Sequence, residues 1–171
     1  MRPSTIFGAA PAWLCSVASA ATADVIELEM PLDCEVGRNC MIHQYVDHSR
    51  ASNASDYQCG GLTNSGHNGT DFRLPTLAAQ RAGVNVLAAA RGQVLRARDG
   101  MPDQMMSAAN APSIADRECG NGVIISHGNG WETQYCHLMQ DSVGVKRGDW
   151  VSAGQPLARV GLSGLNSHTF I

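Results

Sequence analysis

Residues 66–72 have the types and spacing best suited to metal chemistry in this chain. His67 and Asp71 lie four residues apart in the stretch Gly-His-Asn-Gly-Thr-Asp-Phe. A neutral imidazole nitrogen and a carboxylate oxygen are two of the common zinc ligands. The glycines at positions 66 and 69 allow the backbone to turn tightly around them. Two unrelated surface residues can share this spacing, so the case for a zinc site depends on the rest of the chain.

Length and composition favour a single globular domain. A chain of 171 residues can bury a sizeable core, and its hydrophobic content of 44% excludes a disordered chain. The 18 glycines and 7 prolines favour short strands and turns over long helices. The net charge is -3 and the sequence has no basic cluster, so nucleic acid is not expected as a partner.

The first 23 residues have the features of a signal peptide. Arg2 supplies the positive start, residues 6–17 are mostly apolar, and small residues at 18–20 or 21–23 offer a cleavage site. The apolar run is too short to span a membrane. We therefore expect a secreted or periplasmic protein without a membrane span.

Five cysteines follow the predicted leader, at positions 34, 40, 59, 119 and 136. No two of them have the C-x-x-C spacing of a metal site, so we expect disulfides rather than metal ligands. Cys119 and Cys136 flank a predicted hairpin and are expected to pair. The other three compete for a second bridge, and the sequence leaves that pairing open.

The pattern of apolar residues predicts an all-β protein of short antiparallel strands. Residues 47–64 are polar and are predicted to form a loop held by the cysteines. Residues 99–118 lack periodicity and form either a functional lid or an inert surface excursion. We expect N-terminal strands and the disulfide-held loop at 24–65, followed by the main domain at 66–171. The predicted strands cover residues 25–30, 41–46, 84–90, 93–98, 122–127, 131–138, 148–151 and 155–161.

Five blocks in order resemble one enzyme family. The first is the His67–Asp71 stretch, and the fourth is Tyr-Cys-His-Leu at residues 135–138. Together they resemble the lysostaphin-type zinc metallopeptidases, the Gly-Gly endopeptidase family of peptidoglycan hydrolases. The blocks lie at residues 66–72, 86–94, 120–130, 135–138 and 148–164.

The resemblance implies a twisted antiparallel sheet, described as a barrel-sandwich hybrid or duplicated hybrid motif, with Zn²⁺ at the floor of a groove. His67 and Asp71 match the first two zinc ligands of the family. His137 matches a catalytic histidine that orients water or stabilises the developing oxyanion, and His127 matches a structural position. The expected substrate is the peptide cross-link of bacterial peptidoglycan.

The sequence departs from the family pattern after Gly164. The third zinc ligand of the family comes from a His-x-His motif on a following strand, whereas this chain has the single His168 and ends at Ile171. We therefore expect a C-terminally truncated domain that lacks its final strand and is weakly active or inactive. The alternative is a non-catalytic module of the same fold that binds cell wall or activates another hydrolase. The presence of His67, Asp71 and His137 favours the enzyme.

Overall fold

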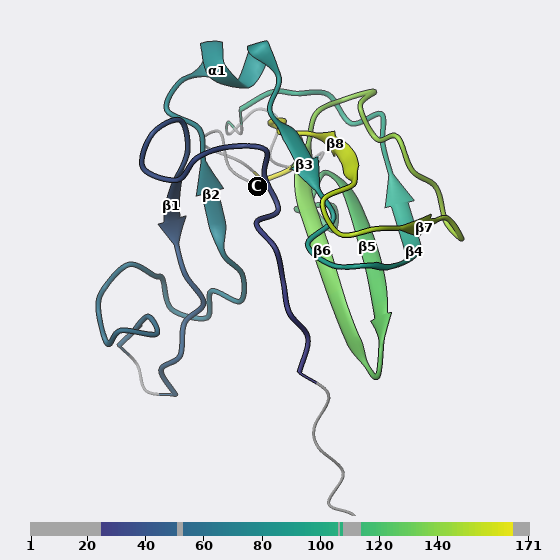
Figure 1. Cartoon of the computed structure of the whole chain (residues 1–171). Coiled ribbons are helices and arrows are strands. Elements are labelled where there is room, and N and C mark those ends of the chain that lie inside the picture. Colours follow the sequence, from purple (N-terminus) through teal and green to yellow (C-terminus); the bar gives the residue numbers. More distant parts are fainter. Residues whose placement is uncertain (1–24, 51–52, 106, 108–113, 166–171) are drawn as a thin grey trace, which may run out of the picture.

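The computed structural model describes residues 25–50, 53–105, 107 and 114–165. The predicted leader and His168 lie outside these residues. The described strands form a four-stranded sheet in the order β6-β5-β4-β7 and two two-stranded sheets, β1-β2 and β3-β8, all antiparallel (Figure 1). This confirms the predicted fold class. The elements are β1 (Met41–Gln44), β2 (Asp71–Arg73), α1 (Leu77–Ala82), β3 (Asn85–Leu87), β4 (Gly92–Arg98), β5 (Asn121–Gly128), β6 (Trp131–Leu138), β7 (Trp150–Val151) and β8 (Pro156–Arg159).

The β5-β6 hairpin is the longest pairing in the four-stranded sheet. Asn129 and Gly130 close its turn with φ values of 50° and 83°, a backbone region that favours these residue types. Along β5, Val123 and Ile125 are fully buried and alternate with half-buried residues, as expected for a strand with one face on the core. The predicted disulfide between Cys119 and Cys136 ties the start of β5 to the end of β6.

One hydrophobic core joins the N-terminal segment to the sheets. Leu32 and Cys40 belong to the same buried cluster as Leu74, Val86 and Leu138. In Figure 1 the β1-β2 pair lies to the left of the β3-β8 pair and of the four-stranded sheet. None of the helices in the described residues is long and apolar enough to cross a membrane.

Two local features differ from the predictions. Residues 25–30 are not a strand, although the Glu29 N–H donates to the carbonyl of Ala89, just beyond β3, at 2.7 Å. The predicted strands at 84–90 and 93–98 are present as β3, which pairs with β8, and β4, which pairs with β5 and β7. The six-residue helix α1 was not predicted, because it is too short to show a helical repeat. Thr76 caps its N-terminus by accepting the Ala79 N–H.

The predicted loop at residues 47–64 is held by carboxylates rather than by cysteines. Cys34 pairs with Cys40 outside this loop, and Cys59 within it is unpaired and exposed. Asp56 instead binds the loop internally, because its carboxylate accepts the backbone N–H groups of Gln58, Gly60 and Leu62 at 2.8–3.0 Å. Hydrogen bonds to an ionised acceptor are stronger than neutral ones, so a single buried carboxylate can order such a loop.

Candidate metal centre and active site

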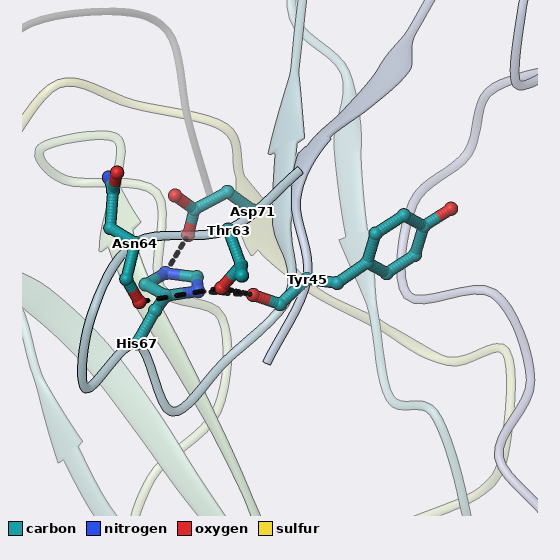
Figure 2. Close-up of polar contacts among 5 residues, drawn as sticks. All are labelled: Tyr45, Thr63, Asn64, His67 and Asp71. Atoms are coloured by element: carbon teal, nitrogen blue, oxygen red, sulfur yellow. Dashed lines mark hydrogen bonds and ion pairs between the residues drawn. The ribbon is translucent and has the colours of Figure 1, made fainter. Parts of the chain in front are cut away.

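The structure brings the two predicted metal ligands together. His67 lies in the loop before β2, and Asp71 is the first residue of β2. The His67 Nε2 and Asp71 Oδ1 atoms are 3.3 Å apart, and the two side chains are 20% and 27% exposed (Figure 2). The pairing of β2 with β1, in which Asp71 lies opposite Gln44, fixes the position of the carboxylate.

The other ring nitrogen of His67 is already occupied. Nδ1 lies 2.7 Å from the Tyr45 carbonyl oxygen. A carbonyl can only accept, so Nδ1 carries the proton, and in the neutral ring Nε2 keeps its lone pair. That lone pair faces a carboxylate oxygen, so a cation between the two acceptors would make the contact favourable.

The spacing of the two acceptors matches zinc. Nitrogen and oxygen ligands lie about 2.1 Å from zinc, so two of them at a tetrahedral angle are about 3.4 Å apart. The observed separation of 3.3 Å is close to this value. Their donor types and their spacing therefore both fit a zinc ion.

His137 lies near the end of β6 and shares the neighbourhood of Asp71. Its Nδ1 is 2.7 Å from the carbonyl oxygen of Ser163. Burial lowers the pKa of His137 below its ordinary value of 6.5, against smaller opposing effects from the Ser163 carbonyl and the negative charge of Asp71. His137 is therefore neutral at pH 7, with the proton on Nδ1 and a lone pair on Nε2.

A β-bulge turns His137 out of the regular strand pattern. Val123 pairs with Tyr135 and Asn121 pairs with Leu138, so β6 has one more residue than β5 over this interval. His137 adopts a positive φ of 55°. Simple alternation predicts Tyr135 and His137 on one face, whereas Tyr135 and Leu138 are the residues that are buried. The bulge explains the difference.

Backbone and side-chain contacts fix the carbonyl that binds His137. The Ser163 hydroxyl donates to the Leu138 carbonyl at 2.7 Å. The neighbouring Leu162 N–H donates to Asp103 Oδ1 at 2.6 Å. Asp103 belongs to the 99–118 segment, which was predicted to be a lid or an inert excursion. Through Asp103, its described beginning supports the segment that contacts His137, whereas residues 106 and 108–113 lie outside the described residues.

Tyr45 and Asp47 are parts of the site that the sequence did not reveal. The Asp47 carboxylate accepts the backbone N–H groups of Gly66 at 2.9 Å, Ser49 at 2.9 Å and Ser55 at 3.1 Å. These bonds lower the pKa of Asp47, and the bond from Gly66 has the largest effect. An Asp two residues before a Ser is a common turn pattern. Nothing in that pattern indicates a contact with a residue next to His67.

A groove of about 640 Å³ borders the loop between the two predicted ligands. Its walls come from residues 68–70 of that loop, from residues 133–135 of β6 and from residues 28–31 of the N-terminal segment. Peptide-sized clefts of this kind are typical binding sites. Thr70 and Phe72, on either side of Asp71, line this groove, whereas His67, Asp71 and His137 are not among its lining residues.

The described residues place two candidate metal donors together, His67 and Asp71. No group of three or more His, Cys, Asp or Glu residues suited to a metal occurs within the described parts of the chain. His127, expected to be structural, has both ring nitrogens bonded within the protein. Its Nδ1 lies 2.8 Å from the Arg91 carbonyl oxygen, and its Nε2 lies 2.8 Å from Thr133 Oγ1.

Comparisons with known proteins found both a sequence relative and solved structures that are similar to this chain. The curated relative Peptidoglycan DD-endopeptidase ShyA of Vibrio cholerae serotype O1 is 38% identical over 98 residues, which make up 57% of this chain and 16% of ShyA. The structure of the SpoIIQ-SpoIIIAH pore forming complex matches with a TM-score of 0.52 at 20% identity, covering 84% of this chain and 75% of that one. A zinc containing peptidase from Vibrio cholerae matches with a TM-score of 0.45 at 22% identity, covering 75% and 35%.

The family model for peptidase family M23 matches residues 65–170, more than half of the chain. This region contains His67, Asp71 and His137, together with every strand of the structure except β1. The chain therefore belongs to peptidase family M23, the lysostaphin-type peptidoglycan endopeptidases.

Proposed function

We propose that this chain is a secreted or periplasmic zinc metalloendopeptidase that cleaves peptide cross-links of bacterial peptidoglycan. His67 and Asp71 hold the metal, and His137 acts on the attacking water. The observation that carries the proposal is the 3.3 Å separation of His67 Nε2 and Asp71 Oδ1, with Nδ1 of His67 bonded elsewhere. Family membership and the two disulfides, which are typical of extracytoplasmic proteins, support it.

The chemistry follows from the protonation of the two histidines. Zinc at this position would polarise a peptide carbonyl and make water more acidic. His137 has its proton on Nδ1, facing Ser163, so its free Nε2 can accept a hydrogen bond and then a proton from water. Stabilising an oxyanion would instead require a proton on Nε2. Of the two roles implied by the family, the geometry favours orienting and deprotonating water.

The test is to separate metal binding from cleavage. Zinc content of the purified full chain is measured by elemental analysis, and release of peptides from isolated peptidoglycan is followed by chromatography. Asp71→Asn should lose both zinc and cleavage. His137→Gln should keep zinc and lose cleavage. The control Asp33→Asn, which alters an exposed carboxylate remote from the ligand loop in the sequence, should change neither.

Equal zinc content in Asp71→Asn and Asp33→Asn would contradict the proposal that Asp71 binds the metal. Full cleavage by His137→Gln would contradict the proposal that His137 orients and deprotonates the attacking water. Either result is independent of the other, because His137 is not among the two donors.

A non-catalytic module is the second candidate, favoured by one observation. The described residues provide two donors, whereas a catalytic zinc site commonly has three protein ligands. A shared fold also does not imply a shared reaction, and the solved pore forming complex has this fold. Wild-type protein that sediments with isolated peptidoglycan but releases no peptide from it, with zinc supplied, would support this candidate over the enzyme.

A further inference from the structure

We propose that Asp47 is the positioning residue that aims His67 at the metal. The inference rests on the proposed function and extends it to a residue outside the region matched by the family model, which begins at residue 65. Asp47 follows β1 and lies 20 positions before His67 in the sequence. It does not touch the metal position in this proposal, and it acts through the backbone on either side of His67.

Asp47 binds that backbone from both directions. Its carboxylate Oδ2 accepts the Gly66 N–H at 2.9 Å. Its own N–H donates to the His67 carbonyl oxygen at 2.7 Å. Asp47 therefore binds both the N–H at the start of the Gly66-His67 dipeptide and the carbonyl at its end. Gly66 has a φ of 76° and, as a glycine, has many other conformations available, so such a clamp is needed to select one.

The clamp also sets the direction of the imidazole ring. The carbonyl of Tyr45, two residues before Asp47, accepts from His67 Nδ1 at 2.7 Å and from the Thr63 hydroxyl at 2.7 Å (Figure 2). Residues 45–47 thus hydrogen-bond both the ring of His67, through the Tyr45 carbonyl, and its backbone, through the Asp47 N–H. With Nδ1 bound to Tyr45, Nε2 lies 3.3 Å from Asp71 Oδ1. Groups that orient a metal-binding histidine in this way typically contribute about 10- to 100-fold in metal affinity.

The same loop contains a matched control. Asp56 also accepts three backbone N–H groups, from Gln58, Gly60 and Leu62, and its pKa is also lowered by them. None of these donors belongs to the ligand loop at residues 66–71. Asp47 and Asp56 are therefore both carboxylates that bind backbone N–H groups of this loop, but only Asp47 binds the backbone of Gly66 and His67.

The experiment compares Asp47→Asn with Asp56→Asn in the full chain. An asparagine keeps the size of the side chain but replaces one acceptor oxygen with a donor, so at least one N–H bond is lost in each variant. The readouts are the zinc dissociation constant, measured by competition with a chelator, and the visible absorption spectrum of the cobalt-substituted protein, which reports ligand geometry. Thermal melts of the metal-free variants show how far each is destabilised.

We expect Asp47→Asn to weaken zinc binding by about 10-fold or more and to alter the cobalt spectrum. Asp56→Asn should lower the melting temperature but leave the zinc dissociation constant within about 3-fold and the cobalt spectrum unchanged, because it does not touch the ligand loop. Equal changes in zinc affinity in the two variants would overturn the proposal and leave Asp47 as a structural residue only.

Two further arms keep the outcomes separate. If Asp47→Asn does not fold, Asp47→Glu and Asp56→Glu are compared in the same way, and equal zinc affinities again overturn the proposal. Wild-type protein that binds no zinc would contradict the proposed function itself. Tight zinc binding by wild type and by both variants contradicts the role of Asp47 alone.

Discussion

Glycine should be tolerated better than alanine at position 137, although the position lies in a strand. His137 has a φ of 55°, in the left-handed region that is unfavourable for residues with a Cβ atom. Both substitutions remove the imidazole and its bond to the Ser163 carbonyl, so the comparison between them isolates the backbone. Gln134, three residues earlier in the regular part of β6, is the matched control.

The expected magnitude follows from two opposing effects. In a regular strand, glycine is less stable than alanine by about 0.5–1 kcal/mol, because the unfolded chain gains conformational freedom. At a left-handed position alanine carries an additional cost of roughly 1–2 kcal/mol that glycine avoids. The glycine-minus-alanine difference should therefore shift by about 1–2 kcal/mol in favour of glycine between Gln134 and His137.

The assay is urea unfolding of the four variants in the presence of a chelator, with the free energy of unfolding extrapolated to water. A shift of this size also appears as a difference in melting temperature of roughly 2–8 °C for a protein of this length. Identical glycine-minus-alanine differences at positions 134 and 137 would refute the reasoning. The bulge would then not constrain His137 in the manner described.

Two other predictions concern the disulfide and pH. Replacing Cys119 and Cys136 together by serine should lower the free energy of unfolding by about 3 kcal/mol, because the bridge closes a loop of 17 residues. In the same urea titrations, the control Cys59→Ser should change it by less than about 0.5 kcal/mol. The pKa of His137 is lowered in the folded state, so the unfolded chain takes up the proton first as pH falls below 6.5. The free energy of unfolding of the metal-free protein should therefore decrease as pH falls below 6.5. It should depend less on pH in His137→Gln, and equal pH dependence in the two proteins would contradict this.

Features that depend on neighbouring residues were predictable from the sequence. β5 and β6 match predicted strands because the apolar alternation and the Gly-Asn-Gly turn are local signals. The Cys119–Cys136 disulfide followed from the same hairpin, since a bridge across paired strands needs only their register. The pairing of Cys34 with Cys40 had no comparable signal, because no turn pattern favoured it over Cys59.

Features that depend on backbone groups far apart in sequence were not predictable. The contacts of His67 with Tyr45 and Asp47 are made by a carbonyl oxygen and a backbone N–H, which every residue type except proline can offer. The β6 bulge likewise changes which residues face the core without changing the composition of the strand. Alternation therefore failed at His137, the position where the backbone leaves the regular pattern to serve the site.

The two histidines of the site are oriented by the same device. Nδ1 of His67 binds the Tyr45 carbonyl, and Nδ1 of His137 binds the Ser163 carbonyl, each at 2.7 Å. Replacing the side chain of Tyr45 leaves its carbonyl in place, so a scan of single side chains would overlook this support. Carboxylates outside the ligand motif hold the backbone next to each contact, because Asp47 accepts the Gly66 N–H beside His67 and Asp103 accepts the Leu162 N–H beside Ser163. Variation at these two carboxylates should therefore affect the site more than replacement of the Tyr45 side chain, which leaves the Tyr45 carbonyl in place.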